Sequence, residues 1–152
     1  MDYTIRRAGE DDFPAILHLI KELAEYERSL DLVTNTVEQM KNEKEFFRCF
    51  VAETTDHKII GMALCFIAYS TWVGKSIYLE DIIVGKEHRG RKIGSALMER
   101  VLKEAREENC KRVRWQVLDW NERAIDFYRK WGAAINSEWL NCTLDEAGLA
   151  AI

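Results

Sequence analysis

The stretch EHRGRKIGSAL, residues 87–97, places basic side chains around two glycines just before an amphipathic pattern that continues through Val101 and Ala105. A helix N-terminus carries partial positive charge and normally attracts Asp or Glu, so cations here need a reason. A strand–glycine turn–helix junction points backbone N–H groups outward, and with the helix dipole they form an anion site. Gly90 and Gly94 let the backbone approach that anion closely. The pattern favours a polyphosphate site; a solvated basic helix end is the alternative.

Two common phosphate loops do not match this spacing. A Walker loop requires GxxxxGK[ST], but no lysine follows Gly94. A dinucleotide fingerprint requires GxGxxG, but residue 92 is Lys. A polyphosphate at this turn must therefore be held by another kind of glycine loop.

Two adjacent carboxylates, Glu80 and Asp81, interrupt the apolar strand pattern SIYLEDIIV at residues 76–84. A carboxylate among apolar neighbours is costly unless it has a partner or a task. Simple strand alternation places the two side chains on opposite faces of the sheet. Ion pairs with Arg112 or Arg114 on the neighbouring strand are the alternative to a catalytic task.

A further set of aromatic, acidic and amide side chains suggests a pocket for a cationic amine, because aromatic rings and carboxylates both attract cations. For each of them an ordinary surface or core position is the alternative. The set is Tyr26, Glu27, Trp72, Trp115, Gln116, Glu138 and Trp139.

Hydrophobic periodicity predicts the elements that must position these residues. Gly132 is a usual stop for the last helix, and Asn121 is a good N-cap for its start. The order predicts a mixed α/β domain built on one sheet. We expect strands at 4–8, 46–54, 59–69, 76–84, 112–118 and 134–143, and helices at about 13–28, 36–42, from the glycine turn to about 105, and 122–131.

Length and composition limit the classes of function. The 152 residues are 47% hydrophobic and 32% charged, which suits one globular domain spanning residues 1–152. A net charge of −4 gives no footprint for nucleic acid, and no apolar run reaches the ~18 residues of a membrane span. The four cysteines form no CxxC pair, so neither a metal site nor a disulfide framework is expected. Residues 1–7 lead straight into a strand pattern without a signal peptide, so we expect a cytoplasmic protein.

Several motifs in the right order resemble the GNAT family of acetyltransferases, over about Ile5 to Cys142. The glycine turn is similar to the family's [QR]-x-x-G-x-[GA] pyrophosphate loop, with Lys92 where the family usually has its middle glycine. NERAIDFYRKWGA, residues 121–133, resembles the N-x-x-A-x-x-F-Y-x-x-x-G-[FA] helix that closes over coenzyme A. IKELAEYE, YSTWVGKSIYLEDI and VLDWNERAIDFY resemble the diamine acetyltransferase branch, and YSTW and VLDWN look most like its thialysine N-ε-acetyltransferases. The implied fold is a single mixed, mostly antiparallel sheet flanked by helices.

The resemblance implies acetyl-CoA as cosubstrate and no metal. It makes Glu80 the base that deprotonates the amine, through a water, and puts Asp81 near that amine. The family's strand has a bulge at this point, which would let both side chains reach the cleft. It also implies that one backbone N–H at 82–84 stabilises the oxyanion. The phenol of Tyr128 is a plausible acid for the departing thiolate, with packing beside Phe127 as the alternative. The implied contacts with coenzyme A are Ile82, Ile83, Val84, Arg89, Gly90, Arg91, Lys92, Ile93, Gly94, Ser95, Asn121, Ala124 and Tyr128.

The acceptor implied by the resemblance is a small primary amine of thialysine, lysine-analogue or diamine type. Tyr26 and Glu27 match a substrate-binding pair at the end of the family's first helix, and Glu80 and Asp81 join the pocket. Ser70 stands where polyamine-acetylating members of the branch carry an acid. The branch is dimeric, so a homodimer is expected. The alternatives are a polyamine acetyltransferase, a protein-lysine or N-terminal acetyltransferase, a non-catalytic acyl-CoA-binding module and an unrelated phosphate-binding domain.

Overall fold

Five strands form one sheet in chain order, β1-β2-β3-β4-β5. The first four pair antiparallel and β4 pairs parallel with β5, so the expected mixed, mostly antiparallel sheet is confirmed. The computed structural model describes all residues, 1–152. Its elements are β1 (Tyr3–Arg7), η1 (Glu10–Asp12), α1 (Phe13–Tyr26), η2 (Leu30–Leu32), α2 (Val37–Asn42), η3 (Lys44–Phe46), β2 (Arg48–Thr54), β3 (Ile59–Ser70), β4 (Gly74–Val84), η4 (Lys86–His88), α3 (Ile93–Glu107), β5 (Val113–Arg114), α4 (Glu122–Lys130) and α5 (Glu146–Ala150), where η denotes a short 3-10 helix.

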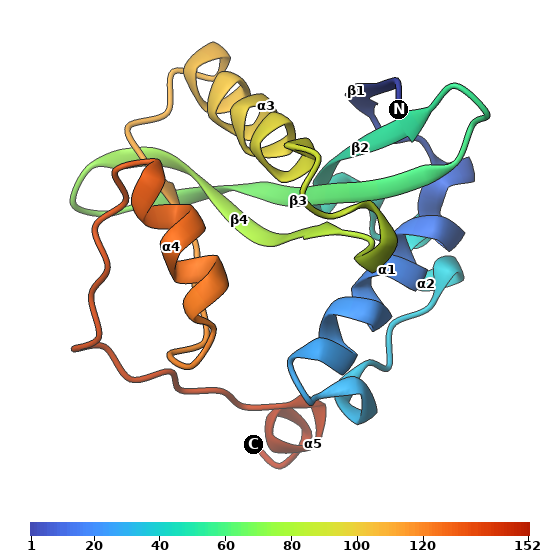
Figure 1. Cartoon of the computed structure of the whole chain (residues 1–152). Helices are drawn as coiled ribbons and strands as arrows, with labels where there is room; N and C mark the ends of the chain where they lie inside the picture. Colours follow the sequence, from blue (N-terminus) through green and yellow to red (C-terminus); the bar gives the residue numbers. More distant parts are fainter. The chain divides into compact units, whose positions relative to one another are not determined.

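The chain divides into two compact units, Met1–Gln116 and Val117–Ile152. The first unit holds the whole sheet with α1, α2 and α3. In this unit α3 covers one face of the sheet, while α1 and α2 lie against the other (Figure 1). The second unit holds α4 and α5.

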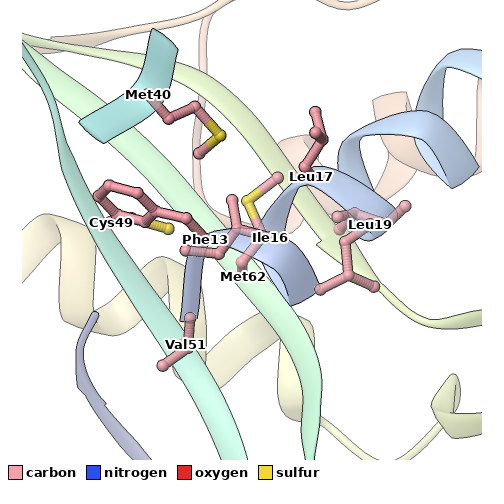
Figure 2. Packing of buried hydrophobic residues seen from close by; sticks show 9 residues of the cluster. Phe13, Ile16, Leu17, Leu19, Met40, Cys49, Val51 and Met62 are labelled. Carbon is pink, nitrogen blue, oxygen red and sulfur yellow. The ribbon is translucent and has the colours of Figure 1, made fainter. Parts of the chain in front are cut away.

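The face under α1 carries a buried apolar cluster (Figure 2). Phe13 and Ile16 of α1 pack against strand side chains of the sheet, and Ile16 is fully buried. Pro14 lies in the first turn of α1, where its missing N–H has no helical partner to lose. The cluster comprises Phe13, Ile16, Leu17, Leu19, Met40, Cys49, Val51, Met62 and Ile83.

The opposite face is closed by α3, whose Ile93, Leu97 and Val101 are buried. Gly61 of β3 permits this close packing. A Cβ at Gly61 would lie 3.0 Å from the carbonyl oxygen of Ile83 and 3.2 Å from Leu97 Cδ1. β4, the strand with the adjacent carboxylates, therefore lies between the buried side chains of α1 on one face of the sheet and those of α3 on the other.

The predicted strand at 112–118 is wrong in length. β5 covers only Val113–Arg114 and pairs with Ile77 and Tyr78 of β4. Beyond Tyr78, the outer edge of β4 has no strand beside it, because β5 pairs no further. The residues after 114 alternate like a strand in the sequence, but they pair with no neighbouring strand.

In the second unit, the predicted helix at 122–131 is confirmed to within one residue as α4. The Asn121 side chain accepts a hydrogen bond from the backbone N–H of Ala124 at 3.3 Å, as expected of an N-cap. Gly132 ends the helix at φ +75°, and the Ala133 N–H bonds back to the Tyr128 carbonyl. The predicted strand at 134–143 is wrong: these residues pair with no strand, and α5 was not predicted.

Candidate functional site

The carboxylate pair lies at a break in the ladder between β3 and β4. Leu64 pairs with Asp81, but Cys65 pairs with Leu79, so Glu80 is left without a partner. Such a bulge interrupts the strict alternation of faces. Leu64 packs on the α1 cluster, which places its partner Asp81 on that face, and the extra residue turns Glu80 toward the same side. The alternation that puts the two side chains on opposite faces is therefore wrong here, and the bulge is confirmed.

Asp81 has an unusual electrostatic environment. Burial, followed by the nearby charges of Glu80 and Glu27, raises the pKa of Asp81 to about 6. Burial also raises the pKa of Glu27, which caps the end of α1. The alternative of an ion pair with Arg112 or Arg114 is not realised, because neither Glu80 nor Asp81 forms an ion pair. These three carboxylates form no ion pair, and together they make an acidic cluster suited to a cationic ligand.

The end of β4 next to these carboxylates presents a free backbone edge. The Gly85 N–H donates to Ile60 O at 2.9 Å, so odd-numbered residues here face β3. Ladder alternation then turns the N–H groups of Ile82 and Val84 toward the edge that β5 has left. By the same alternation, the N–H of Ile83 points toward β3, and the Ile83 side chain is buried. Two outward N–H donors beside a carboxylate pair can hold an extended ligand and polarise a carbonyl.

The glycine turn follows directly and opens α3. Gly90 adopts φ +79° and Lys92, the N-cap of α3, adopts φ +62°, both in the left-handed region. These turns leave the exposed Arg91 and Lys92 side chains at the helix start, next to the first N–H groups of α3. The turn, the helix dipole and the cations together suit an anion. Lys92 holds the conformation that a glycine adopts more easily, at some cost in backbone strain.

The end of α1 holds this turn in place, through a residue that sequence reasoning missed. The Lys86 N–H donates to Glu22 Oε1 at 2.8 Å, and Arg89 Nη2 lies 4.0 Å from the same oxygen. The Arg89 guanidinium also stacks over the Tyr26 ring at 5.6 Å, and its Nε donates to Val84 O at 3.1 Å. No sequence signal distinguishes Glu22 from other acids of the helix, because it accepts from a backbone N–H. Tyr26, Glu27, the carboxylate pair and the turn are thus brought together.

Ser70 and Trp72 do not join them within one chain. They lie at the tip of the β3–β4 hairpin, where Ser70 pairs with Gly74. Ser70 lies six positions along β3 from Leu64, the partner of Asp81, which corresponds to about 20 Å of strand. The Ser70 hydroxyl is buried and accepts the N–H groups of Trp72 and Val73, both at 3.3 Å, while Trp72 is 83% exposed. In the single chain Ser70 therefore shapes the hairpin turn.

The remaining candidates divide between the two units. Trp115 and Gln116 directly follow β5, in the segment that no longer pairs with β4. In the second unit, Tyr128 is the buried residue of α4, and its ring meets Phe127 edge-on at 5.5 Å. Glu138 and Trp139 lie in the segment between α4 and α5, and both are exposed.

No group of three or more His, Cys, Asp or Glu side chains is arranged to hold a metal ion. No helix has both the length and the apolarity that crossing a membrane requires.

Comparison with known protein families gives a match over most of the chain. The model of the acetyltransferase (GNAT) family matches residues 13–133. Thialysine N-epsilon-acetyltransferase of Bos taurus is 42% identical over 140 residues, which cover 85% of this chain and 82% of that protein. The Mus musculus protein of the same name is 36% identical, covering 90% of this chain and 89% of its own. Spermidine/spermine N(1)-acetyltransferase-like protein 1 of Homo sapiens is 34% identical over 88% of this chain, but only 21% of that longer protein is covered.

Solved structures agree on the fold. The integron cassette protein VCH_CASS6 from V. cholerae has a TM-score of 0.78 at 24% identity, covering 99% of this chain and 97% of that one. The aminoglycoside acetyltransferase meta-AAC0020, solved with trehalose, has a TM-score of 0.78 at 22% identity, covering 94% and 97%. At these identities the likeness concerns the fold alone.

Proposed function

The chain is an acetyltransferase of the GNAT family, and on this premise we propose that it transfers the acetyl group of acetyl-CoA to the primary amine of thialysine or a similar lysine analogue. The observation that carries the proposal is the unpaired carboxylate group Glu27, Glu80 and Asp81 beside the open edge of β4. The relatives named for thialysine support the choice of acceptor. We extend the proposal to one acetyltransferase domain over residues 1–152, because the family match runs across the boundary between the two units.

The chain's own residues fit acetyl-CoA, which supplies the activated acetyl thioester. Backbone N–H groups in the turn from Arg89 to Ser95 meet the pyrophosphate, and the outward N–H groups of Ile82 and Val84 hold the pantetheine arm and polarise the acetyl carbonyl. The left-handed Gly90 and Lys92 support this assignment, since they open the turn toward its anion. By the family motif, Asn121 and Ala124 contact coenzyme A as well.

Activation of the amine falls to the carboxylates. A free alkylamine has a pKa near ~10.4, so at neutral pH it arrives as a cation. Glu27 and Asp81 attract that cation, and Glu80 accepts its proton through a water, leaving the lone pair free to attack directly in a ternary complex. In this proposal the phenol of Tyr128 hydrogen-bonds or protonates the departing thiolate.

We also propose a homodimer in which the hairpin tip of one chain completes the pocket of the other. The supporting observation is the distance of Ser70 and Trp72 from Asp81 along β3, because substrate-binding roles for these residues require a second chain. Sedimentation of the protein at working concentration should give a dimer. A clean monomer that still acetylates thialysine would contradict this part of the proposal.

The function is tested by mixing the protein with acetyl-CoA and a panel of amines and recording thiol release. Thialysine and lysine analogues should be turned over with the highest kcat/KM. Gly94→Asp places a carboxylate at the anion turn and should raise the KM for acetyl-CoA without unfolding the protein. Binding of acetyl-CoA without turnover of any amine would instead identify a non-catalytic acyl-CoA-binding module.

Polyamines are the second candidate acceptor, favoured by the resemblance to the spermidine/spermine relative and by three unpaired carboxylates. A long polyamine has several ammonium groups, and each desolvated one needs a carboxylate partner. Ser70→Asp should therefore move the kcat/KM ratio toward spermidine by an amount on the order of 1–2 kcal/mol. An aspartate can still accept the N–H groups of the hairpin turn, so the fold is kept. A ratio that does not move would exclude position 70 from selectivity.

A further inference from the structure

A second cationic site lies at the far end of α3. A cavity of about 250 Å³ opens between the last turns of α3 and the start of β5. Its polar lining is Arg106, Lys111 and Arg112, and its apolar lining is Leu102, Ala105 and Val113, with the thiol of Cys110 beside them. The length of α3, about 20 Å at 1.5 Å per residue, separates this cavity from the anion turn at the helix start.

The three cations of this cavity have no ion-pair partner. Nearby acids of α3 are already taken: Glu104 pairs with Arg48 and Arg100, Glu107 with Lys103 and Arg100, and Glu108 with Arg48 and Lys75. None of the ion pairs in the structure includes Arg106, Lys111 or Arg112. Three uncompensated charges around one concave surface attract an anion.

One donor in this group is both buried and unsatisfied. The Nε atom of Arg112 is inaccessible to solvent and has no hydrogen-bond partner. A buried polar group without a partner costs free energy. The Nη atoms of the same guanidinium also form no hydrogen bond but are not buried, so an anion in the cavity can accept from them.

The dipole of α3 does not account for these cations. Its negative C-terminal end attracts cations, which often bond to the last carbonyls. Here the carbonyls of Glu104, Ala105 and Arg106 already accept backbone N–H groups from residues 108–110. Asn109 adopts φ +55° to close this cap, so the end of the helix is satisfied without the side chains.

We infer that this cavity binds the phosphate group of a small phosphorylated molecule, with a short apolar body against Leu102, Ala105 and Val113. A phosphate monoester carries about −1.5 to −2 charges near pH 7, which matches three cations better than a carboxylate does. Planar guanidinium groups also bind phosphate in a bidentate manner. Because the cavity lies at the opposite end of α3 from the anion turn, it is a separate binding site and is independent of the proposed acetyl transfer.

Cys110 provides a local readout of occupancy. Cys49 and Cys65 are buried and Cys142 is exposed, so in a Cys142→Ser background Cys110 is the only thiol that is not buried. Alkylation of Cys110 by iodoacetamide, a neutral reagent, is then measured with phenyl phosphate, inorganic phosphate or benzoate as the probe. Because the readout is at Cys110, anions bound at the turn of residues 89–95 do not affect it.

Phenyl phosphate should slow the alkylation in a saturable way, at lower concentration than inorganic phosphate or benzoate. Arg112→Met should weaken the protection by about tenfold or more, because a charged hydrogen bond is lost. The exposed Lys111→Gln gives a second test that leaves the buried groups in place. Lys103→Gln, which removes a cation of α3 that does not line the cavity, should leave the protection unchanged.

Three outcomes would overturn the inference. These are the absence of saturable protection, protection equal in Arg112→Met and Lys111→Gln to that in the parent protein, and stronger protection by benzoate than by phenyl phosphate. The assay needs neither acetyl-CoA nor turnover, so a failed acetyltransferase assignment would leave its result interpretable.

Discussion

Two groups of carboxylates in the first unit have opposite environments. On one side, Asp12 accepts Arg6 Nη1 and Nη2, both at 2.8 Å, and this pairing lowers the pKa of Asp12. Hydrogen bonds from Lys75 and then Arg48 lower the pKa of Glu108 to about 2. On the other side, Glu27, Glu80 and Asp81 have no cation, and the pKa values of Glu27 and Asp81 are raised.

The difference separates acids that stabilise the fold from acids that are available to bind a ligand. A paired carboxylate stabilises the folded state, whereas a buried unpaired one destabilises it. A protein keeps the second kind where function requires it, and displaced pKa values therefore concentrate at functional sites. Four changes test this contrast, in order of decreasing effect.

Removal of the unpaired charges should have the largest effect, on activity. Glu80→Gln and Asp81→Asn should each lower kcat/KM for thialysine by about 10²-fold or more, the range of positioned acid–base groups. The matched control is Glu53→Gln, which breaks an ion pair with Arg6 instead and should leave kcat/KM almost unchanged. Steady-state kinetics on folded variants decides the matter. Equal losses in all three variants would remove the distinction.

Asp81→Asn should also stabilise the protein at neutral pH. The folded pKa of Asp81, about 6, lies above its unfolded value, so the folded state binds the extra proton between roughly pH 4 and 6 and stability falls as pH rises through that window. Asn removes this cost, and we expect a gain of about 1–3 kcal/mol above pH 7, with partial exposure reducing the upper figure. Urea unfolding at pH 4 and pH 7.5 measures it. A variant less stable than wild type at pH 7.5 would contradict the account.

The opposite sign is expected for a paired acid. The folded pKa of Asp12 lies below its unfolded value, so its contribution is present above the unfolded pKa and is lost as pH falls through the folded one. Asp12→Asn should therefore cost about 1–2 kcal/mol at pH 7, since the charged bonds to a partly exposed Arg6 are lost. The same urea series at decreasing pH should bring the variant and wild type together. A difference independent of pH would point to packing rather than charge.

The smallest effect concerns the backbone of the anion turn. Lys92→Gly relieves the left-handed strain at φ +62° but increases the freedom of the unfolded chain, so we expect a net gain of only about 0.5 kcal/mol. The loss of one cation should at the same time raise the KM for acetyl-CoA. Thermal unfolding and kinetics on one preparation give both values. A clear destabilisation would show that Lys92 has a structural contact.

The sequence allowed most of the first unit to be predicted, because its strands and helices have strong hydrophobic periods. β3 differs from its predicted range by one residue at one end, and Gly132 ends α4 as expected. The failures concern features that periodicity does not encode. The segment 134–143 alternates like a strand but pairs with no other strand. β5 stops at Arg114, after which the chain no longer pairs with β4.

The site was predictable by residue type but not by geometry. The adjacent acids stood out because a carboxylate in an apolar strand is costly. Their common face depends on the bulge at Glu80, which residue alternation alone does not reveal. Glu22 acts on a backbone N–H, and Ser70 is remote from Asp81 along β3; neither fact has a sequence signal.

A titration of the Asp81 side-chain carboxyl carbon by NMR, with Asp81→Asn assigning the resonance, tests most directly whether the unpaired carboxylates form the amine site. In the free protein the midpoint should lie near the pKa of about 6. Saturating thialysine should move that midpoint to lower pH, because its ammonium group stabilises the charged carboxylate. A midpoint at the ordinary aspartate value of ~3.9, unchanged by thialysine, would contradict the assignment of this unpaired group as the amine site.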